Sequence, residues 1–185
     1  MELHEIIQQR RAYRSFEPVK ITDELIHDLA EHAMLSPSCN NMQPWRYVFV
    51  HDPEVLKAIF DSMSKNNDWT RLSSMIIAVF SKPDMDCIIK DRIYYLFDAG
   101  MATAFLILRA WDLGLVAHPI AGFDPKKVKD ILGLPEEMML IALVIVGKKK
   151  QAIDPVLTEK QAAQEKQRPE RFPFEKFAYI NRYHP

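Results

Sequence analysis

The sequence predicts one globular domain in which helices cover a central β-sheet. Met138–Val146, MMLIALVIV, is apolar on both faces of a strand, which is expected in the middle of a sheet covered by helices. Other apolar runs typical of strands alternate with segments that have helix start and stop signals. The chain has 185 residues, near the size of one ordinary domain. We therefore expect a single domain over residues 1–185.

Three helices and two strands are predicted in the first half of the chain. Leu3–Gln9 is expected to be a short amphipathic helix. Thr22 is a typical N-cap for a helix that continues to about Leu35, because acidic residues follow it in the first turn. The other elements are a strand at Tyr47–Val50, a helix from Pro53 to about Ser64 and a buried strand at Met75–Phe80.

A long apolar helix is predicted from Ile93 to about Leu113, ending before Gly114. It has too few polar positions for a wide solvent face, so most of its sides must be covered. A second copy of the chain is the simplest cover, and we predict a homodimer with this helix at the interface. A central helix wrapped by its own chain is the alternative.

The second half continues with a strand at Leu115–Ile120 and a helix that Asp124 caps and that ends before Gly133. Residues 148–170 are polar and charged without an apolar period, and residues 172–183 are again aromatic and apolar. We interpret residues 148–185 as a C-terminal arm of the same domain. The arm either exchanges with a partner subunit or packs as a terminal strand on its own chain.

Composition excludes several classes of protein. The formal net charge is −1 and the pI is about 6.6, which does not favour a nucleic-acid binder. The apolar runs are shorter than the roughly 20 residues of a membrane span, and the N-terminus is unlike a secretory signal, so we expect a cytoplasmic protein without membrane contact. Cys39 and Cys87 are far apart and form no CxxC, so we expect two reduced thiols.

Known motifs exclude further chemistry. The five glycines form neither GxGxxG nor GxxxxGK[ST], which argues against Rossmann or P-loop nucleotide binding. The six histidines include no i, i+4 pair, so a metal site built by the protein is not expected. Ser38 is outside any GxSxG motif and Cys39 has no evident local base, which disfavours a nucleophilic hydrolase.

Two stretches are candidates for ligand binding. In RRAYR, Arg10 and Arg14 project from nearly the same side of a helix and could grip a phosphate, although arginines at a helix end often only complement the dipole. In PSCNNMQPW, Ser38, Asn41 and Gln43 could read the edge of a polar heterocycle, although such a loop is more often a satisfied turn. Trp45 is expected in the core.

Five stretches occur in order over nearly the whole chain: RRAYRSF, PSxxNxQPW, DAGMATAFLILRAWDLGL, HPIAGFD and the tail ERFPFEKFAYINRY. Together they resemble the nitroreductase family of flavin enzymes. The resemblance implies an α+β, three-layer fold with a central mixed β-sheet flanked by helices. It also implies an intertwined homodimer that binds one FMN at each subunit interface.

The resemblance further implies roles for individual residues. Those expected at the FMN phosphate and ribityl chain are Arg10, Arg11, Ala12, Arg14 and, late in the sequence, Arg171. Those expected along the ring are Asn67, Pro119, Ile120, Ala121 and Gly122. Those expected to reach the flavin from the partner subunit are Pro37, Ser38, Cys39, Asn41 and Gln43. Arg168 and Lys148–Lys150 are alternative candidates for the late-sequence cation that we assign to Arg171.

The expected activity is therefore that of an FMN-dependent NAD(P)H oxidoreductase. Hydride from NADH or NADPH would reach flavin N5 and then a quinone, a nitroaromatic or a similar electron-poor acceptor in a ping-pong reaction, without a catalytic side chain. One alternative is a protein that stores, delivers or senses FMN without efficient turnover. Another is a basic-arm interaction module, which the balanced charge disfavours.

Overall fold

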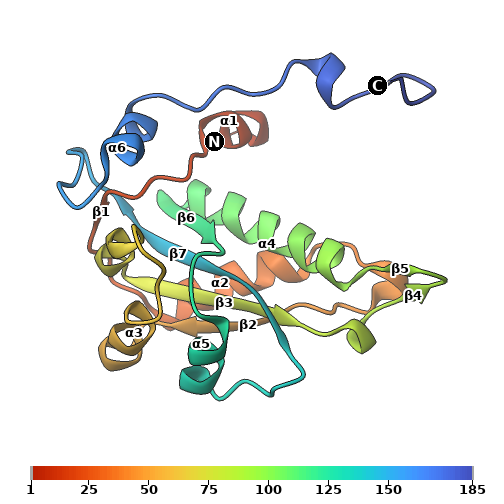
Figure 1. Cartoon of the computed structure of the whole chain (residues 1–185), viewed down its shortest axis with the longest axis horizontal. Helices are drawn as coiled ribbons and strands as arrows, with labels where there is room; N and C mark the ends of the chain where they lie inside the picture. Colours follow the sequence, from red (N-terminus) through yellow and green to blue (C-terminus); the bar gives the residue numbers. More distant parts are fainter. Residues whose placement is uncertain (1, 185) are drawn as a thin grey trace.

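Five strands form the central sheet of the structure, a computed structural model that describes residues 2–184 (Figure 1). They are β1 (Phe16–Glu17), β2 (Arg46–Val50), β3 (Met75–Ser81), β6 (Leu115–Ile120) and β7 (Met139–Lys149). β7 pairs with both β3 and β6, and its end also pairs with β1. The prediction that the apolar segment 138–146 lies in the middle of a sheet is confirmed.

Every strand pair that the structure describes is antiparallel. Parallel neighbours need a crossover that carries the chain back to the other end of the sheet. The connection from β2 to β3 does not do this, because Val50 at the end of β2 pairs with Ile76 at the start of β3. The α+β class is confirmed, but the strands of residues 2–184 do not form the mixed sheet that we expected.

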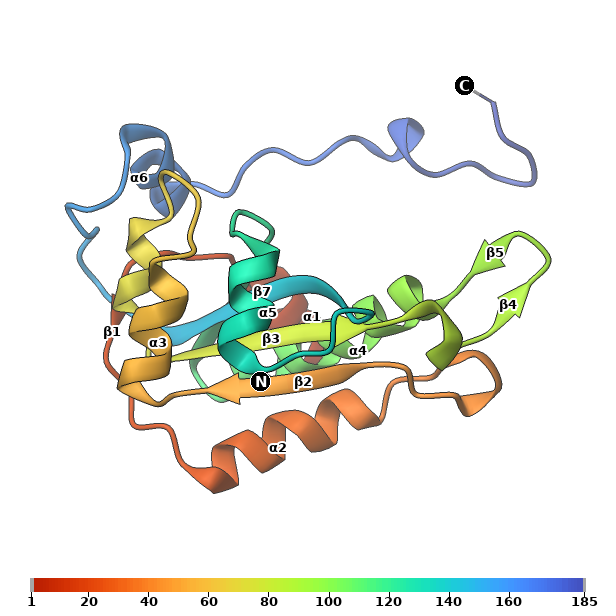
Figure 2. The same ribbon diagram turned by 60° about the horizontal axis from the view of Figure 1, so that its bottom comes forward.

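Helices cover both faces of this sheet (Figure 2). They are α2 (Asp23–Met34), α3 (Pro53–Phe60), α4 (Tyr95–Asp112) and α5 (Pro125–Leu132). Ile76 of β3 belongs to a core cluster with Ile59 of α3 and residues of α5, whereas the next residue, Ile77, belongs to a cluster with Leu29 of α2 and Leu106 of α4. Because side chains alternate along a strand, one apolar strand fills both cores, which gives three layers.

The predicted helix boundaries are confirmed where side chains cap them. The Thr22 hydroxyl accepts a hydrogen bond from the Leu25 N–H at 3.3 Å. The Asp124 carboxylate accepts from the Lys126 and Lys127 N–H groups at 3.0 and 3.1 Å. Gly133 ends α5 in the left-handed region with φ 65°, a conformation that glycine adopts without a steric penalty.

Two further helices flank the arginine-rich segment. α1 (Leu3–Gln9) is confirmed, whereas α6 (Glu159–Lys166) lies within residues 148–170, which we interpreted as part of an extended C-terminal arm. α6 has no apolar period, so hydrophobic patterning could not reveal it. Its start is fixed by a capping box between Thr158 and Gln161.

The C-terminal tail runs away from the rest of the chain after α6 (Figure 1). It contains one short 3₁₀ turn, η4 (Phe174–Lys176), and no described strand, so a terminal strand packed on its own chain is wrong for residues 167–184. Its apolar side chains are exposed, with Phe172 78% and Ile180 73% accessible. Exchange of this arm with a partner subunit remains a prediction.

α4 is covered by its own chain on one side. Ala99, Ala102 and Ala110 are fully buried, whereas Phe97 and Leu96 on the same helix are 63% and 46% exposed. The interpretation of a helix wrapped on all sides by its own chain is therefore wrong. Across residues 2–184, none of the helices has the length and apolar character needed to cross a membrane.

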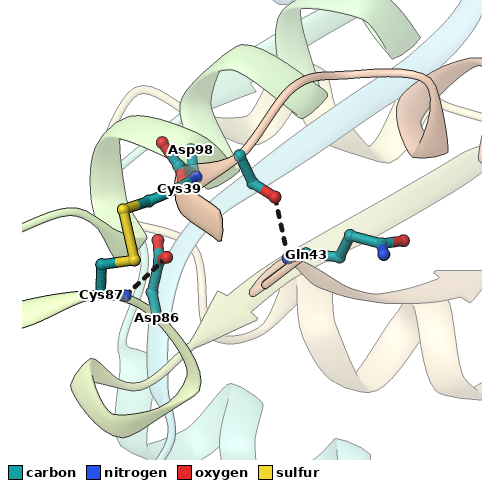
Figure 3. The surroundings of a disulfide bond; sticks show 6 residues. Cys39, Gln43, Asp86, Cys87 and Asp98 are labelled. Atoms are coloured by element: carbon teal, nitrogen blue, oxygen red, sulfur yellow. Dashed lines mark hydrogen bonds between the residues drawn. A yellow bond between two sulfur atoms is a disulfide. The ribbon is translucent and has the colours of Figure 1, made fainter. Parts of the chain in front are cut away.

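A disulfide joins Cys39 and Cys87, which corrects the expectation of two reduced thiols (Figure 3). Cys39 begins the turn η1 (Cys39–Asn41) between α2 and β2. Cys87 follows η3 (Pro83–Met85) and precedes the hairpin of β4 (Ile88–Ile89) and β5 (Arg92–Ile93). The fold brings the two Cα atoms to 5.9 Å, within the usual disulfide range of about 4.4–6.8 Å. The sequence separation of 48 residues could not indicate this contact.

Candidate functional site

The residues that we expected at the FMN phosphate and ribityl chain meet at a cavity of about 170 Å³. This cavity lies between the segment that follows α1 and the end of α6. The cavity is lined by Arg10, Arg11, Ala12, Arg14, Gln164, Arg168, Pro169 and Arg171. Residues from opposite ends of the sequence therefore form one wall of five arginines. Arg168 was an alternative candidate for the late-sequence cation, whereas Gln164 and Pro169 were not among the predicted site residues, because the sequence has no apolar helical period there.

Backbone carbonyls and an aromatic ring hold two of these arginines. The Arg168 guanidinium donates to the carbonyls of Gln8 and Arg10 at 2.6 and 2.7 Å, which ties the tail to the end of α1. The Arg11 guanidinium lies 4.7 Å from the centre of the Tyr13 ring and donates to the Tyr13 hydroxyl at 3.2 Å. Neither arrangement neutralises the positive charge.

Glu165 is the acidic residue of α6 next to this cavity, and backbone groups occupy its carboxylate. The Arg14 N–H donates to Oε1 at 2.8 Å and the Ser15 N–H donates to Oε2 at 3.4 Å. Glu165 is 9% exposed. This buried contact fixes α6 against the arginine-rich segment without pairing a guanidinium at salt-bridge distance.

The cavity is strongly electropositive. Within residues 2–184, the guanidinium groups of Arg10 and Arg171 have no carboxylate within 4.0 Å. Burial, with the neighbouring charges of Arg168 and Arg171, lowers the pKa of Arg10 below its usual value. Burial also lowers the pKa of Arg14, although Glu165 opposes the shift. Such a cluster of planar donors suits a dianion such as a phosphate.

The second group of predicted residues adjoins the first through aromatic contacts. The Arg14 guanidinium lies 5.8 Å from the centre of the Trp69 ring, in the turn η2 (Asp68–Leu72). The Trp69 indole N–H donates to Asn67 Oδ1 at 3.2 Å, and Asn67 Nδ2 donates to the Gly122 carbonyl at 2.8 Å. A Cβ on Gly122 would lie 2.5 Å from Asn67 Nδ2, so any side chain at this position would displace the Asn67 amide.

The remaining residues of this group end β6 at the surface. Pro119 and Ala121 are exposed, and Ile120 and Gly122 are partly buried. The structure thus brings Asn67 next to Gly122, and Trp69 contacts both Asn67 and the Arg14 guanidinium.

His118 is a buried residue that packs against Trp69. Its ring stacks on Trp69 with 4.8 Å between centroids, and Nδ1 lies 3.0 Å from the Tyr13 carbonyl oxygen. Because that oxygen can only accept, Nδ1 carries the proton. Burial lowers the pKa of His118 to about 4, and the charges of Arg14 and Arg10 act in the same direction. His118 is therefore neutral at pH 7.

The third predicted group, the loop of residues 37–43, lies elsewhere. It connects α2 to β2 beside the β4–β5 hairpin, at the end of the sheet opposite to the arginine cavity (Figures 1 and 2). Asn41 and Gln43 have positive φ values of 57° and 50°. The Ser38 hydroxyl accepts from the Gln43 N–H at 3.0 Å, while the Gln43 side chain extends away from the disulfide (Figure 3). In one chain this loop does not meet the arginines.

Two buried aspartates lie behind this loop, and sequence patterning did not single them out. Asp98 of α4 accepts from the Cys39 N–H at 2.7 Å, and Asp86 accepts from the Cys87 N–H at 2.7 Å. Burial raises the pKa of Asp86, and the nearby Asp98 carboxylate adds to the increase. These groups form an acidic cluster around the disulfide.

The lysines that competed with Arg171 are engaged outside the cavity. Lys148 pairs with Glu17 at 2.7 Å, and Lys150 pairs with Asp154 at 2.9 Å. The Lys149 ammonium lies 4.3 Å from the centre of the Tyr13 ring. Arg168 and Arg171 are the late-sequence cations that line the cavity.

Comparison with known proteins gives the family. The family model described as Nitroreductase family matches residues 7–148. The chain belongs to the nitroreductase family. A Thermus thermophilus protein named NADH dehydrogenase is 28% identical over 171 residues, which cover 75% of this chain and 82% of that protein.

Solved structures agree with this family assignment. The structure of an oxidoreductase containing FMN aligns with a TM-score of 0.85 and 25% identity, covering 97% of this chain and 91% of the other. A nitroreductase family protein from Clostridium novyi NT aligns with a TM-score of 0.76 and 25% identity, covering 82% and 87%. The nitroreductase resemblance of the sequence and the α+β fold are thereby confirmed.

Proposed function

We propose that this nitroreductase family protein is an FMN-dependent oxidoreductase that uses NADH or NADPH to reduce quinones, nitroaromatics or similar acceptors in a ping-pong reaction. The main support is the cavity of five arginines, none of which pairs with a carboxylate of residues 2–184 at salt-bridge distance, together with the contacts that link Arg14 through Trp69 and Asn67 to Gly122. The relatives support the same reading, since one is named NADH dehydrogenase and a solved structure contains FMN.

The residues present fit the phosphate end of FMN. Arg10 and Arg171 lie in the cavity wall and have no described carboxylate partner. Burial lowers the pKa of Arg10, and the charges of Arg168 and Arg171 add to the decrease; a phosphate dianion would offset this repulsion. Ala12, also in the wall, is exposed and adds little bulk. The donor set therefore suits a phosphate monoester.

The cavity is too small for the whole cofactor. Its volume is about 170 Å³, whereas pockets that enclose a ligand of drug size have about 300–1,000 Å³. In our proposal the phosphate enters the cavity and the ring lies along residues 119–122, with Asn67 at its polar edge. The open side of the ring then needs another cover.

A second copy of the chain provides that cover in our proposal. Exposed apolar side chains on α4 continue into a groove of about 530 Å³ between α4, α1 and α2. The aromatic tail is also exposed, with Phe177 66% and Tyr183 70% accessible. Apolar patches of this extent mark interaction surfaces. In the homodimer, the partner's copy of the loop of residues 37–43 would reach the ring, as the family resemblance implies.

When bound, FMN supplies the redox chemistry by accepting hydride from NAD(P)H and passing electrons to the acceptor. The residues of this chain have binding and electrostatic roles. The arginines hold the phosphate, and Asn67 and the backbone of residues 119–122 orient the ring. His118 stays neutral at pH 7, so it adds no further positive charge under this surface. No side chain is assigned a proton-transfer step.

The absorbance spectrum of the purified protein tests this proposal. We expect the visible bands of oxidised flavin, and their loss when NADH or NADPH is added without oxygen. Bound flavin that stays oxidised would instead indicate a protein that stores, delivers or senses FMN. A colourless protein that does not take up added FMN would refute the proposal.

A further inference from the structure

We propose that Cys39, Cys87 and Asp86 form a redox-controlled binding site for Zn²⁺ or a similar thiophilic divalent cation. The reduced dithiol form binds the metal, and the disulfide form does not. The two sulfur atoms and one carboxylate oxygen of Asp86 lie within 4.8 Å of one another. Thiolate and carboxylate groups are ordinary zinc ligands in proteins.

The buried carboxylate of Asp86 is the feature that indicates a cation site. Its side chain is 6% exposed, and its Oδ1 accepts from the Cys87 N–H. Its Oδ2 is buried and has no hydrogen-bond partner among residues 2–184. Leaving a buried acceptor unsatisfied costs about 1–3 kcal/mol, and more when the group is charged. Asp86 lies directly beside the disulfide (Figure 3), so a cation bound by the two sulfurs would lie next to this carboxylate.

The surroundings supply no cation of their own. Within the described chain, no lysine, arginine or histidine nitrogen lies within 4.0 Å of the Asp86 or Asp98 carboxylate. Asp98 is 1% exposed and accepts from the Cys39 N–H at 2.7 Å, which holds the backbone of a proposed ligand. Asp86 thus lies beside two sulfurs, and Asp98 is buried next to Cys39, without a described positive partner for either carboxylate, an arrangement that favours a divalent ion.

The geometry requires little movement. The Cα atoms of the cysteines are 5.9 Å apart, and Asp86 and Cys87 are consecutive residues. Zinc bonds of about 2.3 Å to sulfur and about 2.0–2.2 Å to a carboxylate place ligand atoms roughly 3.5–3.8 Å apart in a tetrahedron. Cys39 and Cys87 are partly buried, so solvent can supply the fourth ligand.

The redox step and the binding step both balance. A phosphine reductant transfers two electrons to the disulfide and takes an oxygen atom from water, whose two protons convert the sulfurs to thiols. The phosphine leaves as its oxide. Metal binding then replaces the two thiol protons, which are released to solvent.

Metal uptake by the full-length protein tests this proposal. The protein is reduced with tris(2-carboxyethyl)phosphine without oxygen, desalted and titrated first with Co²⁺ and then with Zn²⁺. We expect about one Co²⁺ per chain, with thiolate-to-cobalt charge transfer and the visible bands of a tetrahedral site, and displacement of Co²⁺ by Zn²⁺. The oxidised protein should bind neither ion.

Three variants make the test specific. Cys87→Ser should abolish the charge-transfer band, and Asp86→Asn, which keeps both cysteines, should weaken Zn²⁺ binding about tenfold or more. Asp91→Asn changes an exposed carboxylate in the nearby hairpin and should bind normally. Circular dichroism checks that each variant is folded. A reduced protein without the cobalt band would overturn the proposal, as would equal uptake by the oxidised protein or wild-type affinity in folded Asp86→Asn.

Discussion

The arginine cavity and the cluster around the disulfide have opposite electrostatic character. The cavity gathers five arginines, and its nearby Glu165 carboxylate is occupied by backbone N–H groups. The disulfide cluster gathers Asp86 and Asp98 without a described cation at salt-bridge distance. In both places, residues 2–184 provide no ion-pair partner of opposite sign. In our two proposals each region is completed from outside the chain, by an anion in one case and a cation in the other.

The largest expected effect concerns the disulfide. Cys87→Ser in metal-free, oxidising buffer should lower the free energy of unfolding by about 4 kcal/mol, because the bond closes a loop across a sequence separation of 48 residues. Urea denaturation measures the change. Reducing agent should destabilise the wild type similarly and leave the variant unchanged. Equal stability of the two proteins would show that the disulfide cluster is not fixed by this bond.

The next largest expected effect is a loss of stability at low pH, where His118 would add a positive charge close to the arginines. His118 has a folded pKa of about 4 against 6.5 when unfolded. Well above pH 6.5, His118 is neutral in both the folded and the unfolded state. As the pH falls toward 4, protons bind the unfolded chain preferentially, so stability should fall by roughly 3 kcal/mol from this group. Denaturation of wild type and His118→Gln at pH 7.5 and 4.5 gives the difference. His51→Gln, an exposed control, should keep the wild-type slope, and a wild-type slope in His118→Gln would contradict the assignment.

FMN affinity tests whether the arginine cavity is the site that binds the anionic phosphate. Arg14→Ala should weaken FMN binding about 10- to 100-fold, since a hydrogen bond to a charged group contributes about 1.5–3 kcal/mol. Lys149→Ala removes an exposed charge that lies over the Tyr13 ring outside the cavity, and it should retain FMN. Fluorescence titration of the stripped proteins measures both affinities. Similar losses in the two variants would mean that general positive charge, and not the cavity, attracts the cofactor.

The smallest expected effect tests whether the arginine cavity of one subunit and the loop of residues 37–43 of the other subunit form one FMN site. Arg14→Ala damages the cavity, and Gln43→Gly removes a loop amide at a position whose φ of 50° glycine tolerates. If each site combines the cavity of one chain with the loop of the other, an equal mixture after subunit exchange should regain about a quarter of the intact sites. FMN binding of the mixture against each variant alone measures this. No recovery in a mixture shown to contain hybrid dimers would place both regions in separate functions.

Local chemistry in the sequence determined most of the elements. Thr22 and Asp124 cap the helices that they were expected to cap, and Gly133 ends α5. Met138–Val146 could be recognised as a central strand because every position is apolar. The arginine motif was also evident as a cluster of cations, and Arg10 and Arg14 both line the cavity. The expectation that they share one side of a helix is wrong, because α1 ends at Gln9 and residues 10–15 are not helical.

Only the tertiary structure decided which distant residues meet. Arg168 and Gln164 reach the cavity because Glu165 binds the backbone N–H groups of Arg14 and Ser15, a contact that leaves no periodic signal in the sequence. The Cys39–Cys87 bond and the unpartnered oxygen of Asp86 likewise depend on how loops pack at one end of the sheet. Side-chain patterning reports which face of an element is apolar, but contacts between loops depend on the path of the whole chain.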